Sequence, residues 1–165
     1  VHRAVAIGGI KRIMNVNKSE QIHATCIALD GRGVLLRGPS GSGKSDMALR
    51  LIDAGAELVA DDRVDLSLAE GILTASAPPA LRDLLEVRGL GILQFPALTA
   101  APVAVVCNLV AALDVKRHPE DNCTTILGVE LPIFALAPFE ASAILKVQLA
   151  LRLTNGSIMR AHDAN

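Results

Sequence analysis

The run from Gly38 to Ser45 carries glycines, a lysine and a serine in the complete order G-x-x-x-x-G-K-[ST]. Glycines let successive backbone N–H groups point inward around an anion, and the positive end of a following helix adds to the attraction. Lys44 would bring a mobile positive charge to the outer phosphates, and the Ser45 hydroxyl can ligate Mg²⁺. We therefore predict a nucleotide phosphate site rather than a chance glycine loop. It is formed by Gly38, Pro39, Ser40, Gly41, Ser42, Gly43, Lys44 and Ser45.

Two adjacent aspartates, Asp61 and Asp62, follow a short apolar run and have the spacing to return beside this loop. A helix of about eleven residues climbs about 16 Å at about 1.5 Å per residue. A strand of about five residues at about 3.3 Å each covers a similar distance back. Because side chains alternate along a strand, the two carboxylates cannot both face the same way. One can hold a metal ion through water while the other accepts a proton from an attacking hydroxyl. The alternative is a solvated turn at the end of a strand.

The composition limits the class of protein. The chain has 165 residues, 51% hydrophobic and 20% charged, which predicts one folded domain with a sizeable core. A formal net charge of -1 and an aromatic content of 2% argue against a nucleic-acid-binding surface. The uncharged stretch 96–113 contains Pro96 and Pro102 and is interpreted as a loop and a buried strand, so no membrane association is predicted. The three widely spaced cysteines are interpreted as buried free thiols in a reducing cytoplasm.

Strand and helix signals alternate along the chain, which predicts an α/β fold, and the hairpin signals favour a mixed sheet over a parallel one. Asp30-Gly31 predicts a hairpin turn, and Gly55 predicts the end of the helix that follows the phosphate loop. The predicted strands are 23–29, 33–37, 58–60, 64–68, 72–75, 90–95, 103–107 and 130–136. The predicted helices are 44–54 and 141–153, with a helical turn at 79–85.

The two ends of the chain are expected to lie outside the catalytic unit. We predict an N-terminal extension at residues 1–20, one domain at 21–153 and a C-terminal tail at 154–165. The apolar patch near the start precedes its charges, which is the reverse of a signal peptide. Met14 is the expected start of translation, with residues 1–13 read from upstream sequence.

Three blocks of sequence, in order, resemble the catalytic domain of the HPr kinase/phosphorylase family. The first contains Ile22-His23 and the phosphate loop, and the second runs from Leu58 to Val64 through the paired aspartates. The third is Glu86-Val87-Arg88-Gly89-Leu90-Gly91-Ile92. The similarity covers roughly residues 21–153 and is weaker after Phe95. A phosphate loop alone would be generic, whereas the three blocks together are specific.

The resemblance implies an ATP- and Mg²⁺-dependent kinase that phosphorylates a serine of an HPr-like phosphocarrier protein of the phosphotransferase system and reverses this by phosphorolysis. It implies that Asp62 transfers the serine proton, that His23, Lys44 and Asp61 belong to the active site, and that Ser45 and Glu86 ligate Mg²⁺. It also implies a phosphate-loop fold shared with phosphoenolpyruvate carboxykinase and a hexameric homo-oligomer in the cytoplasm.

Departures from the family pattern leave alternatives open. We expect no counterpart of the family's separate N-terminal domain, as in its short form. Gln94-Phe95-Pro96 stands in place of a longer glycine-containing loop, and Ala137-Pro138-Phe139-Glu140 stands where the family has a Pro-Gly-Arg block that serves the reverse reaction. Phosphorylation is therefore the firmer expectation. A kinase for a small hydroxyl metabolite and a non-catalytic ATP-binding sensor module are the alternative functions.

Overall fold

The computed structural model describes residues 6–7, 10–11 and 17–161. Met14, the expected start, lies outside the described residues. The short strands β1 (Ala6–Ile7) and β2 (Ile10–Lys11) pair only with each other within the described part of the chain. The remaining strands are β3 (Lys18–His23), β4 (Thr25–Leu29), β5 (Arg32–Arg37), β6 (Glu57–Ala60), β7 (Arg63–Ala69), β8 (Ile72–Ser76), β9 (Leu84–Val87), β10 (Gly91–Gln94), β11 (Ala101–Leu109), β12 (Asn122–Ile126) and β13 (Val129–Leu136). The helices are α1 (Lys44–Asp53), α2 (Ala143–Thr154) and the 3-10 turns η1 (Pro79–Leu81) and η2 (Ala112–Asp114).

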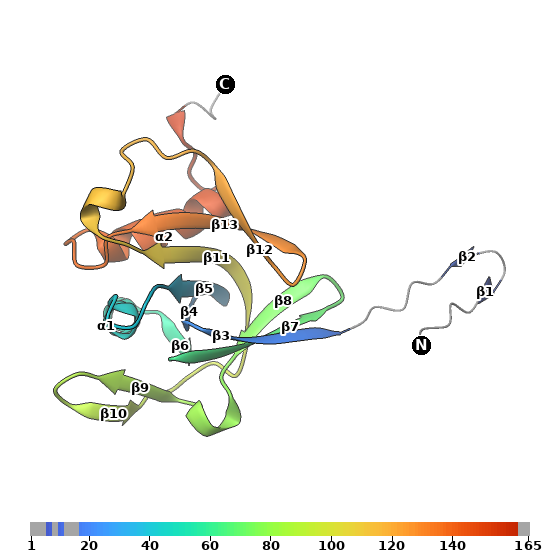
Figure 1. The fold of residues 1–165 in the computed structure, drawn as a ribbon, viewed down its shortest axis with the longest axis horizontal. Coiled ribbons are helices and arrows are strands. Elements are labelled where there is room, and N and C mark those ends of the chain that lie inside the picture. Colours follow the sequence, from blue (N-terminus) through green and yellow to red (C-terminus); the bar gives the residue numbers. More distant parts are fainter. Residues whose placement is uncertain (1–5, 8–9, 12–16, 162–165) are drawn as a thin grey trace.

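Strand β11 is the hub of a curled mixed sheet (Figure 1). It runs parallel to β5 on one side and to β13 on the other, and its first residues pair antiparallel with β8. Strand β4 lies antiparallel between β5 and β6, and β12 adds to β13 as a hairpin. The predicted α/β class and mixed sheet are confirmed.

Two consecutive antiparallel strand pairs, β3–β7 and β4–β6, are joined at a bend in the sheet. Strand β3 pairs with β7, and β4 pairs with β6. The bend therefore falls at Ala24, between β3 and β4, and at Asp61-Asp62, between β6 and β7. The prediction of one continuous strand over 23–29 is therefore wrong at Ala24, because His23 ends β3 and the strand β4 begins at Thr25. The bend places the two aspartates at a corner of the sheet rather than along an edge.

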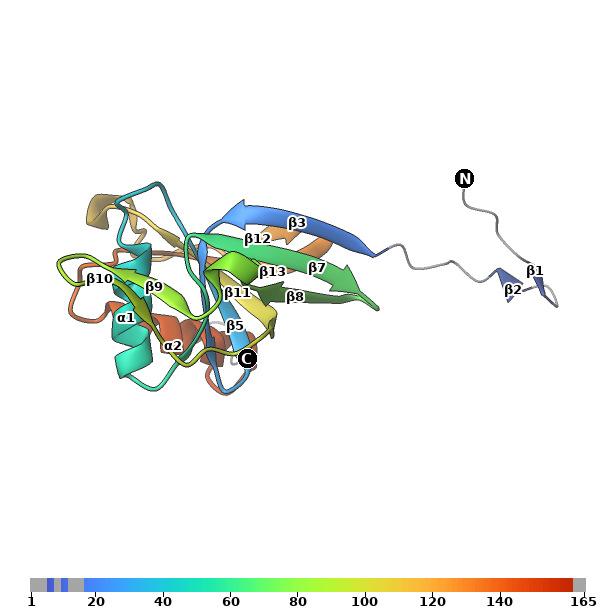
Figure 2. The ribbon, with the colours of Figure 1, turned by 90° about the horizontal axis from the view of Figure 1, so that it is seen from below.

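Both faces of the strands that carry the phosphate loop are covered. Helices α1 and α2 and the β9–β10 hairpin pack on one face, where Met47, Leu51, Leu85 and Val147 are fully buried. The other face packs against β3, β7 and β8, where Val64 and Ala75 are fully buried. Figure 2 shows α1 and α2 on one side of β5 and the β3–β7–β8 strands on the other. The strand that precedes the phosphate loop is thus fixed from both sides.

Helix α1 follows the prediction over 44–54 almost to the residue. Its end is a Schellman motif, in which the Ala56 N–H donates to the Leu51 carbonyl at 2.9 Å and the Gly55 N–H donates to Ile52 at 3.0 Å. Gly55 has a φ of 107°, a conformation that glycine adopts without a steric penalty. The sequence signal at Gly55 therefore marks the helix end correctly.

Some predictions fail where polar residues form strands. The expected helical turn over 79–85 ends at Leu81, and β9 begins at Leu84. Strands β3 and β12 were not predicted, because their sequences KSEQIH and NCTTI lack an apolar alternation and are largely exposed. These strands are held by the ladders of their neighbours β7 and β13 rather than by burial.

The cysteines divide by burial. Cys26 and Cys107 are fully buried, and burial raises the pKa of each thiol to about 12, so both stay protonated and unreactive. Cys123 is exposed on β12, which corrects the expectation that all three thiols are buried. Among the described residues, no helix combines the length and the apolar character needed to cross a bilayer. The stretch 96–113 contains β11 instead, as predicted.

Candidate active site

The sheet topology brings three chain segments to one end of the strands. Strands β5 and β6 both run antiparallel to the β4 strand between them, so their last residues lie at the same end as the first residue of β4. The phosphate loop leaves β5 at this end, and Asp61 follows β6 there. Thr25, which opens β4, is therefore placed between them.

The phosphate loop leads directly into α1. Gly43 is the residue before the helix, with a φ of 98°, and its carbonyl accepts the first helical hydrogen bond from the Met47 N–H at 2.8 Å. A Cβ at Gly43 would lie 2.9 Å from Cζ of Phe139. Glycine is thus required there for its backbone conformation and for the close approach of an aromatic ring. The positive end of α1, equivalent to about half an elementary charge, faces the loop.

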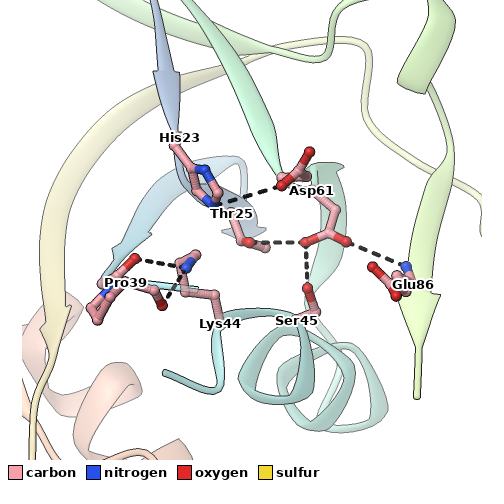
Figure 3. A network of polar contacts seen from close by, with 9 residues as sticks. His23, Thr25, Pro39, Lys44, Ser45, Asp61 and Glu86 are labelled. Carbon is pink, nitrogen blue, oxygen red and sulfur yellow. Dashed lines mark hydrogen bonds and ion pairs between the residues drawn. The ribbon is translucent and has the colours of Figure 1, made fainter. Parts of the chain in front are cut away.

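Lys44 lies under the loop with only 7% of its surface exposed. Its Nζ donates hydrogen bonds to the carbonyl oxygens of Gly38 at 2.7 Å and Pro39 at 3.0 Å (Figure 3). Burial lowers the pKa of Lys44 from its ordinary value of 10.5, and the nearby carboxylates of Asp61 and Asp62 partly oppose that shift. The ammonium group is therefore held next to the loop with little water around it.

Asp61 is the centre of a hydrogen-bond network that joins four chain segments (Figure 3). It is 6% exposed, and its Oδ1 accepts bonds from the hydroxyls of Ser45 at 2.8 Å and Thr25 at 2.9 Å. Its Oδ2 accepts a longer bond of 3.3 Å from the backbone N–H of Glu86 on β9. A buried carboxylate is tolerated only when hydrogen bonds replace its hydration, and these three donors supply them.

Asp62 lies in a different environment from its neighbour. It has a φ of 68°, its side chain is 62% exposed, and its Oδ1 is 3.6 Å from Nε2 of His23. His23 ends β3, directly opposite Arg63, the first residue of β7. The predicted opposite orientation of the two carboxylates is confirmed, because Asp61 faces Ser45 and Asp62 faces His23.

A cavity of about 560 Å³ connects these groups. The sequence-predicted residues that line it are His23, Ser40, Gly41, Gly43, Lys44, Ser45, Asp62 and Glu86. Asp61 lies behind this wall and reaches the cavity through Ser45. Pro39 and Ser42 face a different cavity.

Sequence reasoning missed several residues of this cavity. Thr25, Asp46, Leu49 and Phe139 line it without having been singled out for such a role. Asp46 directly follows Ser45, and Thr25 carries a hydroxyl two residues after His23; this closeness in the sequence was the available signal. Phe139 carried no such signal, since only the tertiary fold brings it to Gly43.

Oxygen donors of the kind that Mg²⁺ prefers lie at one end of the cavity. Among residues 17–161 and the described parts of the N-terminus, there is no group of three or more His, Cys, Asp or Glu side chains that could hold a metal alone. Ser45 and Glu86 line the cavity with a hydroxyl and a carboxylate, and the Asp61 carboxylate lies behind them, bonded to the Ser45 hydroxyl. Mg²⁺ prefers such hard donors and usually takes one or two carboxylates together with water and phosphate oxygens.

Comparison with known proteins shows which family this chain resembles. Residues 14–133 match the family model described as "HPr Serine kinase C-terminal domain". A relative from Clostridium tetani named "HPr kinase/phosphorylase" is 47% identical over 111 residues, covering 67% of this chain and 36% of the relative. One of the same name from Lactobacillus acidophilus is 38% identical over 128 residues, covering 70% of this chain and 39% of the relative. The chain thus spans little more than a third of the length of these curated relatives.

A solved structure agrees with the sequence comparison. The structure titled "Structure of the Hpr(Ser) kinase/phosphatase from Coxiella burnetii" is similar with a TM-score of 0.75 and 26% sequence identity. The match covers 84% of this chain and 97% of the other. The curled mixed sheet is therefore the arrangement found in that protein.

We predict that Thr25 stabilises the fold through Asp61. Thr25→Val keeps the shape of the side chain but removes one donor to a buried carboxylate, and should lower the free energy of unfolding by about 1–3 kcal/mol in urea denaturation. Thr25→Ser is the matched control, since it keeps the hydroxyl and loses one methyl group, worth about 0.8 kcal/mol. A valine variant as stable as the unmodified protein would contradict this role.

A second prediction concerns the charge of Lys44. Its ammonium form attracts phosphate, and its pKa is lowered by burial, so affinity for tripolyphosphate should fall as the pH rises through a value below 10.5. In Lys44→Arg the guanidinium stays protonated over this range, and the decrease should disappear. Titration calorimetry of the two proteins at matched pH values between 7 and 10 measures both profiles. Identical profiles for the two proteins would show that Lys44 does not govern binding.

Proposed function

The chain belongs to the family of the HPr serine kinase C-terminal domain, and on that premise we propose that it is a cytoplasmic, ATP- and Mg²⁺-dependent serine kinase. Its proposed acceptor is a serine hydroxyl of an HPr-like phosphocarrier protein. The observation that carries the proposal is the different placement of two adjacent carboxylates. Asp61 is buried against the phosphate loop, whereas Asp62 opens into the same cavity as Lys44 and Ser45.

In this proposal, the backbone N–H groups of the loop and the Lys44 ammonium hold the negative charge of the triphosphate. The serine oxygen attacks the γ-phosphorus, the bond to the β–γ bridging oxygen breaks, and ADP leaves. Phosphoryl transfer demands mainly positioning and charge neutralisation, which a preorganised loop at a helix N-terminus supplies.

Asp62 takes the proton that the serine hydroxyl loses. Its carboxylate is exposed and 3.6 Å from His23, so it is available to an incoming hydroxyl, unlike the fully bonded Asp61. A positioned base of this kind contributes about 10²–10⁴-fold to a rate. His23 faces Asp62 across the bend and would orient its carboxylate.

The residues around Ser45 fit Mg²⁺. The Ser45 hydroxyl and the Glu86 carboxylate are the proposed ligands, with Asp61 behind them. The metal ion would neutralise charge on the phosphate groups when it is bound. Within this chain, Asp61 holds Ser45 in place through its 2.8 Å hydrogen bond and touches Glu86 through the backbone.

The region around Phe139 bears on the direction of the reaction. The resemblance implies an arginine-containing block there that serves phosphorolysis, whereas this chain has Phe139, an uncharged side chain, in the lining of the cavity. We therefore propose the kinase direction as the main activity.

The surface next to the cavity supports a protein acceptor rather than a small metabolite. Glu86, Val87 and Arg88 line the cavity, and the hairpin they belong to continues to Leu90 and Ile92. These two apolar side chains are 74% and 70% exposed. Exposed apolar residues in a cluster are typical of a protein contact surface.

On α2, Leu145 and Leu149 are also exposed and are the proposed contacts of a homo-oligomer, a hexamer by family resemblance.

The direct test of the proposed function is phosphate transfer to the organism's own serine-bearing phosphocarriers, read by mass spectrometry. Asp62→Asn should reduce the rate by about 10²–10⁴-fold, because asparagine tolerates the left-handed backbone of this residue but cannot take a proton. ATP binding should remain, which shows that the variant is folded. A protein that binds ATP and transfers phosphate to no carrier would be a sensor module, and transfer only to a metabolite pool would indicate a small-molecule kinase.

We also predict that the hairpin tip recognises the acceptor. Leu90→Ser combined with Ile92→Ser removes apolar surface that is already exposed, so stability should change by less than about 0.5 kcal/mol. The KM for the carrier protein should rise several-fold with kcat little changed, since the contact lies outside the reacting groups. Ile72→Ser, at a similarly exposed apolar residue on β8, is the control and should leave KM unchanged. Equal effects of the two substitutions would argue against a docking role.

A further inference from the structure

A second cavity, of about 750 Å³, adjoins the phosphate loop and is distinct in character from the polar one. Two loop residues, Pro39 and Ser42, form one wall, and most of the remaining wall is apolar. Its size is within the range of about 300–1,000 Å³ that holds small ligands. The apolar wall residues come from the ends of β11 and β13 and include Leu109, Val110, Ala112, Ala137 and Pro138.

The two cavities meet at Phe139, which lines both. The loop lies between the two cavities, with Ser40, Gly41 and Gly43 lining the polar one and Pro39 and Ser42 lining the apolar one. A ligand whose phosphates lie in the loop can therefore reach the apolar cavity by passing the ring of Phe139.

Charge divides the two cavities further. The polar cavity contains Lys44 and Arg88, whereas the lining of the apolar cavity, as far as the chain is described, has no Lys, Arg or His. Its two acidic residues are Asp114 and Glu140, and Glu140 is paired with Nζ of Lys146 at 2.6 Å. The lining of the apolar cavity thus offers phosphate groups no cationic side chain, and a planar neutral ring is better suited to it.

Phe139 is held in place although its side chain is 73% exposed. The preceding residue, Pro138, accepts a hydrogen bond from the Arg50 guanidinium of α1, and the following residue, Glu140, is paired with Lys146 of α2. The segment is therefore tied to both helices. An exposed ring on a fixed backbone is a preorganised stacking surface, because little freedom is lost when a flat ligand covers it.

We propose that the apolar cavity binds the heteroaromatic base of the nucleotide, adenine in the case of ATP, with Phe139 as its stacking partner. This inference rests on the proposed function for the triphosphate and adds the residues that select a nucleotide over a bare polyphosphate. The phosphate loop then lies between two binding sites. The cavity that contains Lys44 binds the charged phosphates, and the cavity that contains Ala112 binds the flat apolar ring.

Calorimetry with Mg·ATP and Mg·tripolyphosphate tests the proposal. The unmodified protein should bind ATP at least about tenfold more tightly than tripolyphosphate, a ratio that base stacking can supply. Ala112→Phe places a ring in the cavity and should remove most of that preference while affinity for tripolyphosphate stays the same. Ala80→Phe is the matched control, because Ala80 is an exposed alanine in the other 3-10 turn and lines neither cavity.

A fluorescence measurement gives an independent readout. The chain has no Trp and no Tyr, so Phe139→Trp introduces a single indole at the proposed stacking position. ATP should quench its emission, and tripolyphosphate should leave it nearly unchanged. Equal affinities for the two ligands, or equal quenching by both, would overturn the base site while leaving the phosphate site intact. Failure of both ligands to bind the unmodified protein would overturn the base site and the proposed function together.

Discussion

The arrangement of the site depends on one buried carboxylate. Asp61 cannot be buried without donors, and its donors come from separate parts of the chain, namely Thr25 at the start of β4, Ser45 at the start of α1 and Glu86 on β9. Losing any donor leaves a desolvated charge underpaired, which costs more than an ordinary hydrogen bond contributes. Satisfying Asp61 therefore fixes the relative positions of the phosphate loop, the central sheet and the hairpin.

The bend of the sheet explains how two neighbouring residues differ so strongly. The Arg63 N–H donates to the Asp61 carbonyl at 2.8 Å, and Asp62 between them adopts a positive φ. This tight turn directs one carboxylate inward and the next toward His23 at the cavity. A straight strand would also place them on opposite faces, but one would then lie within the sheet packing. The bend allows Asp62 to line the cavity while Asp61 lies behind its wall, bonded to Ser45.

The phosphate loop and the position of Asp61 beside it could be predicted, because both depend on rules that act over a short stretch of sequence. The loop pattern, the length of α1 and the helix-ending Gly55 place Asp61 beside Ser45 by simple geometry. Thr25 and Phe139 could not be found in this way. Thr25 matters because β4 lies between β5 and β6, and Phe139 because the end of β13 reaches Gly43. Both placements come from strand order, which periodicity along the sequence does not encode.

Lys44 shows why this loop can be stable without a ligand and still bind one. Its Nζ donates to the carbonyl oxygens of Gly38 and Pro39, so two of the three N–H donors of the ammonium are paired and hold the loop. A phosphate oxygen can accept from the third donor, or replace a carbonyl as the acceptor, and in the second case only the difference between the two bonds contributes to affinity. Burial increases that difference, because an ammonium with little hydration loses less water when it meets an anion. The desolvation that lowers the pKa of Lys44 is thus the same effect that strengthens its interaction with a phosphate group.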